Sequence, residues 1–341
     1  MKKVRSMNDI AAMVGVSEST VSRALNNSPL ISESVRKKIQ QIAAEHHYSP
    51  NRNARSLSMK TAHAIAVVIN QDEDDSEDIS VQMFTLQMLA TLAEELAANK
   101  LEMLLSTGRS IRESWYDYFI RAKRADGLIV LGPGSTEAHF EDLSRQRAPF
   151  VVWEGRHSSQ SYCVVSGDNR QGGFLATQHL LLSAKRQRIL LLGPYHNVVG
   201  ELRYKGYLDA LAQYALPVQD SLLVRCGFSI DGGYKALMEY IASNGLNFDA
   251  IFAISDTIAF GAMKALREHA ISVPDTVAVV GFDDVPSAEI ASPSLSSVRQ
   301  DSHDAARLLV KRVLSAIKGE RPRSITLSTR LIVRESSLCK R

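Results

Sequence analysis

The chain has 341 residues, of which 45% are hydrophobic, so it is long enough for two or three domains with a sizeable core. No apolar run approaches the roughly 20 residues that a membrane span requires, and the first ten residues lead into no signal-like segment. We therefore expect a cytoplasmic protein with no membrane partner. The three scattered cysteines form no zinc or disulfide pattern, and we expect neither a metal site nor a cofactor.

Charge is distributed unevenly along the chain, whose formal net charge is +3. Residues 1–60 contain ten Lys or Arg and four Asp or Glu, so this segment carries +6 and the remainder carries −3. A basic head on a mildly acidic body is typical of a polyanion-binding module joined to a second domain.

The first 50 residues show the pattern of three short helices. In "MNDIAAMVG" we expect Asn8 or Asp9 to cap a helix that Gly15 ends. "SESTVSRALN" follows at once, with Ser17 as its expected cap and Val21 on its inner face. "SESVRKKIQQIAAEHH" has the period of a third helix. Two helices joined by a tight turn predict a helix-turn-helix, and a plain three-helix bundle is the alternative.

Short apolar runs alternate with amphipathic helices from residue 64 onward. The expected strands lie at 64–70, 101–107, 127–132, 149–154, 188–193, 222–227, 250–255, 277–282 and within 325–336. The expected helices lie at 85–100, 174–184, 202–214, 232–243, 258–269 and 302–319. This alternation predicts parallel sheets with helices on both faces. The polar stretch "EGRHSSQSY" divides the strands into two lobes, and ligands of such sheets bind beyond the carboxyl ends of the strands.

The segment from "MNDIAAMVGVSESTVSRALNNS" to "NRNARSL" resembles the headpiece and hinge of the LacI/GalR (lactose/galactose repressor) family. The resemblance continues through "DNRQGG", "LRYKGY", "AIFAISDTIAFGAMKAL", "VPDTVAVVGFDDVP" and "PSLSSVRQ". It implies an all-α headpiece at 1–49, a hinge helix at 50–60, and a periplasmic-binding-protein-like α/β body of two doubly wound parallel sheets at 61–341. The expected lobes are about 61–162 plus 299–326, and about 163–298 plus 327–341.

The resemblance also implies that Ser17–Leu25 is a recognition helix in the major groove. Arg23 suits guanine O6 and N7, Glu18 can accept from cytosine N4, and Ser19 is the third base-reading position. The other implied contacts of the headpiece position the helix on the backbone; they are Ser17, Thr20, Ser22 and Asn26.

The hinge "NRNARSL" is expected to order on DNA. Ala54 and Leu57 match the family's minor-groove positions, where Leu57 would wedge between bases. Asn51 and Arg52 complete the expected hinge contacts. The alternative is that Leu57 is a packing residue of a linker.

For the body, the resemblance implies an effector site built from five residues. Arg203 matches an arginine that donates to ligand oxygens, and Asp283 matches a carboxylate that accepts from hydroxyls. Phe228 matches a ring-packing position, Glu154 stands where the family often has Asp, and Ser255 stands where many sugar-binding members have Asn. The alternatives are a solvated Arg, a capping Asp and a core Phe. We expect a sugar or glycoside, with a purine as the alternative.

Two further departures concern the same region. Gly167 replaces a commonly bulkier residue, and the acidic run "DEDDSED" at 72–78 replaces a shorter loop and is expected to be solvated. The changes at Ser255 and Gly167 leave the identity of the effector open.

The sequence thus predicts a ligand-responsive repressor that binds a pseudo-palindromic operator in double-stranded DNA as a homodimer. The end "RESSLCKR" has no leucine heptads of the kind that tether dimers. A solute-binding protein and a sugar-acting enzyme are the alternatives. The headpiece opposes the first. The lack of a Gly-x-Ser-x-Gly elbow, a phosphate loop or a metal-spaced His/Cys cluster opposes the second.

Overall fold

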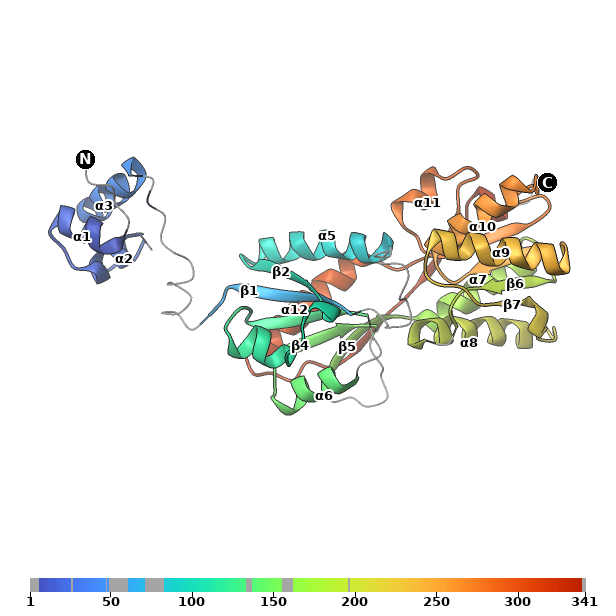
Figure 1. Cartoon of the computed structure of the whole chain (residues 1–341), viewed down its shortest axis with the longest axis horizontal. Helices are drawn as coiled ribbons and strands as arrows, with labels where there is room; N and C mark the ends of the chain where they lie inside the picture. Colours follow the sequence, from blue (N-terminus) through green and yellow to red (C-terminus); the bar gives the residue numbers. More distant parts are fainter. Residues whose placement is uncertain are drawn as a thin grey trace. The chain divides into compact units, whose positions relative to one another are not determined.

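The computed structural model describes residues 6–25, 27–46, 48, 61–70, 83–132, 137–154, 162–195 and 197–338 (Figure 1). The chain divides into two compact units, Met1–Ala62 and His63–Arg341. Several expected DNA contacts lie outside the described residues; they are Asn26, Asn51, Arg52, Ala54 and Leu57. The acidic run at 72–78 lies outside them as well.

The first unit contains the three predicted helices, α1 (Met7–Val14), α2 (Glu18–Leu25) and α3 (Glu33–Glu45). Ser6 caps α1 through a capping box with Asp9, so the expectation that Asn8 or Asp9 would be the cap was wrong. Gly15 ends α1 with φ 75°, in the left-handed region that glycine adopts at little cost.

The core of this unit draws on all three helices. Its buried residues are Ile10, Ala11, Val21, Ala24, Ile39 and Ala43. Ser17 precedes α2, and its Oγ accepts from the Thr20 amide at 3.2 Å, as expected of a cap. Val21 is fully buried, so the opposite side of α2 is the side left free.

A six-stranded parallel sheet forms the first lobe of the second unit, in the order β11-β5-β4-β3-β1-β2. Its strands are β1 (Ala64–Ile69), β2 (Glu102–Thr107), β3 (Gly127–Leu131), β4 (Phe150–Trp153), β5 (Cys163–Gly167) and β11 (Ile325–Leu327). Successive β1 residues face two separate cores, since Ile65 packs with one cluster and Ala66 with the other.

Helices cover both faces of this sheet. α5 (Met83–Ala98) and α12 (Ser302–Ile317) pack on one face through Leu92 and Leu309. A π-helical segment (Tyr116–Arg121) and α6 (Glu137–Arg145) pack on the other through Phe119 and Phe140. Figure 1 shows α5 and α6 on opposite sides of the strands. One turn of 3₁₀ helix, Gly108–Ser110, follows β2.

The second sheet has the order β12-β10-β9-β8-β6-β7 and is parallel except for β12. Its strands are β6 (Ile189–Leu192), β7 (Leu223–Val224), β8 (Ala250–Ala253), β9 (Ala278–Asp283), β10 (Ser296–Arg299) and β12 (Arg330–Ile332). Its helices are α7 (Asn169–Leu182), α8 (Val198–Gln213), α9 (Ile230–Asn244), α10 (Asp256–Glu268) and α11 (Pro286–Ile290), with 3₁₀ turns at Asp220–Leu222 and Glu335–Ser337.

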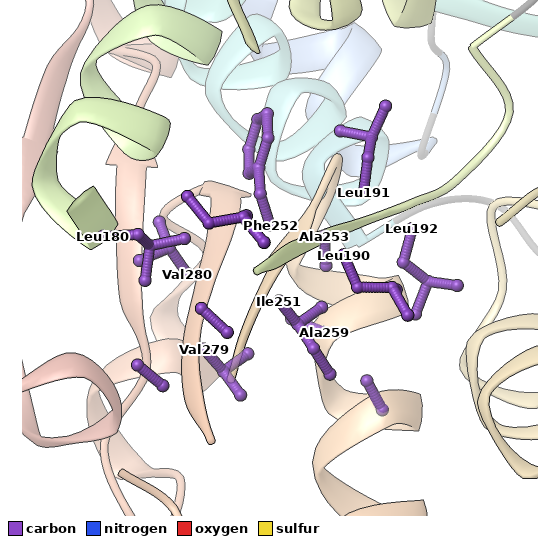
Figure 2. Packing of buried hydrophobic residues seen from close by; sticks show 14 of the residues in the cluster. Leu180, Leu190, Leu191, Leu192, Ile251, Phe252, Ala253, Ala259, Val279 and Val280 are labelled. Atoms are coloured by element: carbon purple, nitrogen blue, oxygen red, sulfur yellow. The ribbon is translucent and has the colours of Figure 1, made fainter. Parts of the chain in front are cut away.

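The core of the second sheet is formed by its central strands and the helices on them. Figure 2 shows Leu190 of β6, Ile251 of β8 and Val279 of β9 in this core, together with Leu180 of α7 and Ala259 of α10. All five are fully buried. The two-sheet α/β architecture that the sequence predicts is therefore confirmed.

The expected division at the polar stretch after Trp153 was wrong. β4 and β5 flank that stretch, yet both belong to the first sheet. The chain leaves the first sheet after Gly167, returns after Arg299, and crosses again between β11 and β12. β5 and β10 were not predicted, because "CVVSG" and "SSVR" are short and have too few apolar residues to suggest a strand.

α7 and α8 pack unusually closely because glycines face each other's backbone. A Cβ on Gly173 would lie closer than 3.0 Å to the Arg203 carbonyl oxygen, and one on Gly206 would meet the Arg170 carbonyl. This close approach brings Arg203 of α8 beside Asn169, the first residue of α7.

Candidate functional site

The recognition helix predicted in the first unit presents a polar outer face. The exposed residues are Ser17, Glu18, Ser19 and Arg23, and Thr20 and Ser22 are half-buried. Ser17 Oγ also lies 2.8 Å from Ser19 Oγ and 2.9 Å from Thr20 Oγ1. Hydroxyls therefore gather at the amino end of the helix, with the Arg23 guanidinium on its exposed side.

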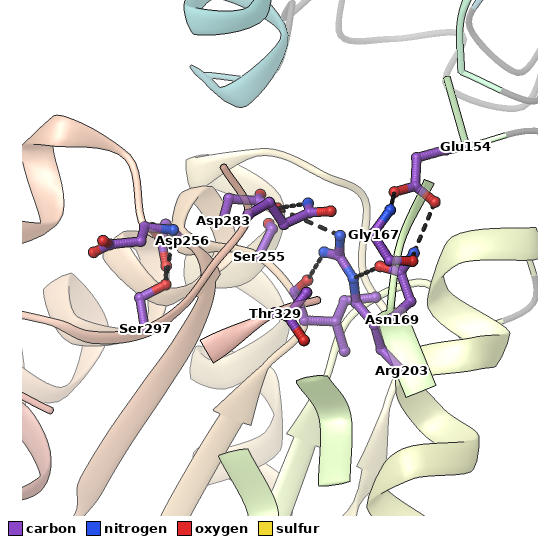
Figure 3. Close-up of polar contacts among 12 residues, drawn as sticks. Glu154, Gly167, Asn169, Arg203, Ser255, Asp256, Asp283, Ser297 and Thr329 are labelled. Carbon is purple, nitrogen blue, oxygen red and sulfur yellow. Dashed lines mark hydrogen bonds and ion pairs between the residues drawn. The ribbon is translucent and has the colours of Figure 1, made fainter. Parts of the chain in front are cut away.

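A buried polar network lies at the carboxyl ends of strands from both sheets (Figure 3). Its members are 1–6% exposed; they are Glu154, Asn169, Arg203, Asp283 and Gln300. Glu154 follows β4 of the first sheet, Asp283 ends β9 of the second, and Gln300 follows β10 on the return to the first lobe. The network therefore joins the two lobes at the edge where ligands of such sheets bind.

Glu154 is held by donors from the end of β5 and the start of α7. The Gly167 amide donates to its Oε1 at 2.9 Å, and Asn169 Nδ2 donates to its Oε2 at 2.7 Å. Both carboxylate oxygens thus face N–H groups.

Arg203 is the centre of the network. Its Nε donates to Asn169 Oδ1 at 2.9 Å, one terminal nitrogen donates to the Ile254 carbonyl, and the other lies 3.4 Å from Asp283 Oδ1. Its guanidinium also stacks on the Phe282 ring, 3.6 Å from the centroid. Burial inside the fold excludes the alternative of a solvated Arg.

Asp283 accepts a second hydrogen bond, from Gln300 Nε2 at 2.8 Å. The other amide atom of Gln300, Oε1, is buried without a hydrogen-bond partner among the residues that the structure describes. Asp284 has a different role: it pairs with Arg299 at 2.5 Å and with Arg334 at 2.6 Å, which fixes the end of β9 against β10 and the C-terminal segment.

Three carboxylate residues here have left-handed backbone, with φ 61° at Glu154, 108° at Asp283 and 53° at Asp284. Such conformations are costly for residues with a side chain and concentrate at functional sites. The surrounding hydrogen bonds hold them in place.

Burial raises the pKa values of three carboxyl groups in and beside this network. Burial raises the pKa of Glu154 to about 7, against the lowering effects of the Gly167 amide, Arg203 and Asn169. Burial also raises the pKa of Asp283, which Arg203 and Gln300 oppose. The pKa of Asp256 is raised well above its usual range by burial and by the Asp283 charge.

The structure brings three of the five predicted effector residues together: Glu154, Arg203 and Asp283. Ser255 lies next to Ile254, and its Oγ accepts from the Ile258 amide at 3.3 Å as the cap of α10. Phe228 is half-buried and packs against the core of the second sheet. This position corresponds to the alternative of a core Phe.

Sequence reasoning missed three members of the site. Asn169 and Gln300 stand inside motifs that carried the resemblance, "DNRQGG" and "PSLSSVRQ", and Phe282 stands in "GFDD". The motifs marked the right segments, but a sequence does not say which side chain of a motif faces inward.

Within the described ranges, no group of three or more His, Cys, Asp or Glu side chains is arranged to hold a metal ion. In the same part of the chain, no helix is both long enough and apolar enough to cross a membrane. Cys163 and Cys226 are free thiols, and burial raises the pKa of both.

Comparison with known proteins gives the family. The profile of bacterial regulatory proteins of the lacI family matches residues 6–51, and that of the periplasmic binding protein-like domain matches residues 177–337. The chain is 30% identical over 333 residues to the HTH-type transcriptional regulator CelR of Thermobifida fusca, covering 96% of each chain. It is 27% identical over 336 residues to the ribose operon repressor of Haemophilus influenzae, covering 97% and 98%.

Solved structures of LacI-family proteins are similar to this chain over nearly its whole length. A CelR–cellobiose complex is 28% identical and has a TM-score of 0.72, covering 98% of this chain and 100% of that chain. The lac repressor dimer bound to operator and the anti-inducer ONPF has a TM-score of 0.82 at 24% identity, covering 99% and 100%, which supports the fold.

The fold and its sites define a helix-turn-helix protein with a body of the periplasmic-binding-protein type. The chain belongs to the lacI family of bacterial regulatory proteins and is a DNA-binding transcriptional regulator, as the sequence predicts.

Proposed function

We propose that the body binds a sugar or glycoside at the network around Arg203, and that binding changes the affinity of the headpiece for its operator. The observation that carries this proposal is the buried position of Arg203 at the carboxyl ends of both sheets, where it contacts Asp283 directly and Glu154 through Asn169. A neutral polyhydroxylated ring can donate to the carboxylates and accept from the guanidinium. The CelR–cellobiose complex, and a ribose-bound LacI-family regulator of Enterococcus faecium that is 25% identical, support a sugar.

We further propose that the protein represses transcription as a homodimer. One recognition helix reads one half-site, so a pseudo-palindromic operator requires two copies. Arg23, Glu18 and Ser19 would read bases, while Ala54 and Leu57 would act in the minor groove. A cytoplasmic location follows from the need to reach DNA, and we expect no catalytic activity, in line with relatives that are regulators.

A purine effector is the alternative within this function. Its ring nitrogens and carbonyls could also meet Arg203 and Asp283, but such a ligand offers fewer hydroxyl donors to two carboxylates.

The test is calorimetry of the full chain against cellobiose, ribose, galactosides, guanine and hypoxanthine. We expect a sugar to bind and Arg203→Met to abolish binding. Arg170→Met is the matched control, because Arg170 makes an exposed ion pair with Asp209 on the neighbouring helix. Tight purine binding without carbohydrate binding would favour the alternative.

A further inference from the structure

Asn169 joins Glu154 to Arg203 through its side-chain amide (Figure 3). It is 1% exposed and is the first residue of α7. Its Oδ1 accepts from Arg203 Nε at 2.9 Å, and its Nδ2 donates to Glu154 Oε2 at 2.7 Å and to the Gly167 carbonyl at 3.2 Å. Each end of the amide therefore has a partner.

The direction of these bonds is fixed by chemistry. A guanidinium only donates, so the amide oxygen of Asn169 must face Arg203 and its NH₂ group must face Glu154. The other carboxylate oxygen of Glu154 already accepts from the Gly167 amide. A proton on Glu154 would therefore meet a donor at either oxygen, and the arrangement requires the ionised carboxylate.

We propose that Asn169 is a positioning residue of the effector site, whose amide orients Arg203 only while Glu154 is ionised. This inference rests on the proposed function, since the site that it positions is the effector site. The charged groups that face Glu154 are Arg203 from α8 and Asp283 from the end of β9, and Gly167 and Asn169 supply the neutral donors.

The consequence is a pH-dependent site. Burial raises the pKa of Glu154 to about 7, so the carboxylate gains a proton as the pH falls through neutrality. A proton on Oε2 breaks the hydrogen bond from Asn169, which then keeps only its 3.2 Å bond to the Gly167 carbonyl. The amide of Asn169 is held less firmly, and it orients the Arg203 guanidinium less well. Effector affinity therefore falls between pH 8 and pH 6.

The hydrogen bonds from Arg203 to Asn169 and from Asn169 to Glu154 form a relay. Its direction between positions 154 and 169 can be reversed by exchanging the carboxylate and the amide. In Asn169→Asp, the new carboxylate still accepts from Arg203 but faces the carboxylate of Glu154. In Glu154→Gln, the NH₂ group of the new amide faces an N–H donor in either orientation, the Gly167 amide in one and Asn169 Nδ2 in the other. In the double variant, the new amide at position 154 accepts from Gly167 and donates to the new carboxylate at position 169. That carboxylate accepts from Arg203, and the total charge is that of the native pair. Of the native contacts, only the 3.2 Å hydrogen bond to the Gly167 carbonyl is lost.

The first measurement needs no effector. Nuclear magnetic resonance of the arginine-labelled full chain follows the Arg203 Nε–H signal, which is identified by its loss in Arg203→Lys. We expect the signal to shift with a midpoint near pH 7, to change position and exchange faster in each single variant, and to recover in the double variant. A pH-independent signal, or a double variant no better than either single one, overturns the relay.

The second measurement is the affinity for cellobiose between pH 6 and pH 8. We expect each single variant to lose affinity about tenfold, the size of one hydrogen bond to a charged group, and the double variant to recover most of it. Asn247→Asp is the control: it adds the same charge near the amino end of β8 and keeps the acceptor for Arg188. If cellobiose does not bind, the sugar that binds in the calorimetry takes its place. If the resonance behaves as expected but none of those sugars binds, the relay stands and the proposed effector class fails.

Discussion

The carboxamide of Gln300 occupies the space that a side chain at position 167 would need. A Cβ on Gly167 would lie closer than 3.0 Å to Gln300 Oε1. Gly167 ends β5 of the first sheet, whereas Gln300 follows β10 of the second. The two residues are therefore a matched pair across the lobes, which gives a structural reason for the glycine that departs from the family pattern.

This pairing predicts the effect of Gly167→Ala. The new methyl group displaces the Gln300 carboxamide and weakens its 2.8 Å hydrogen bond to Asp283, so effector affinity falls while the fold is kept. The same substitution made in a Gln300→Ala background has no amide to displace. A double-mutant cycle by calorimetry checks this, and equal losses in both backgrounds would contradict the steric pairing.

Arg203 is predicted to be important for stability as well as for binding. Arg203→Met leaves the buried carboxylates of Glu154 and Asp283 without their cation, which costs about 3–5 kcal/mol at neutral pH. Arg170→Met breaks an exposed, solvent-screened pair, so we expect a much smaller loss of stability. Urea unfolding measures both. A loss for Arg203→Met no larger than that for Arg170→Met would show that the network is not stabilised by this charge.

Glu154 is predicted to give folding stability a specific pH dependence. The pKa of its carboxyl rises on folding from an ordinary value of 4.5 to about 7. The folded state thus binds the proton more tightly, and the resulting stability is fully present below about 4.5 and is lost as the pH rises through about 7.

Thermal unfolding of the native chain and of Glu154→Gln tests this sign. Asp256 and Asp283 also have raised pKa values but occur in both proteins, so the difference between the two curves isolates Glu154. We expect the native chain to gain stability relative to Glu154→Gln from pH 8 to pH 5. A constant difference would show that Glu154 does not titrate in this range.

Arg23 is predicted to read a base. Arg23→Ala costs about 1–3 kcal/mol of discrimination between operator and random DNA, because a paired contact to guanine is lost. The control is Lys37→Ala on α3, an exposed residue paired with Glu33 at 2.9 Å. Fluorescence anisotropy on both DNA types gives the ratio. An operator-to-random ratio unchanged in Arg23→Ala would assign Arg23 to the phosphate backbone.

Much of the architecture could be predicted from local patterns. The three headpiece helices and most strands have clear apolar periods, and Val21 and Gly15 take their expected places. The boundary between the lobes could not be predicted in this way, because β5 is a five-residue strand whose place depends on pairing with β4 and β11. Strand order is a long-range property that short polar stretches do not encode.

The site was predictable only in part for a similar reason. Arg203 and Asp283 were identified through the resemblance, and the structure brings them together. Asn169 and Gln300 act through the direction of their amides, which is set by the partners around them. Phe282, which stacks on Arg203, was not predicted, because the resemblance pointed to Phe228 as the residue that packs on the ligand ring.

Coupling between the effector site and the headpiece is measured by operator binding of the full chain with and without a bound sugar. Fluorescence anisotropy on a selected operator, titrated with the sugar that binds in calorimetry, compares the native chain with Arg203→Met. We expect the sugar to change the operator affinity of the native chain by about tenfold or more, a coupling within the usual range, and to leave that of folded Arg203→Met unchanged. An operator affinity that is the same with and without saturating sugar in the native chain would contradict this coupling.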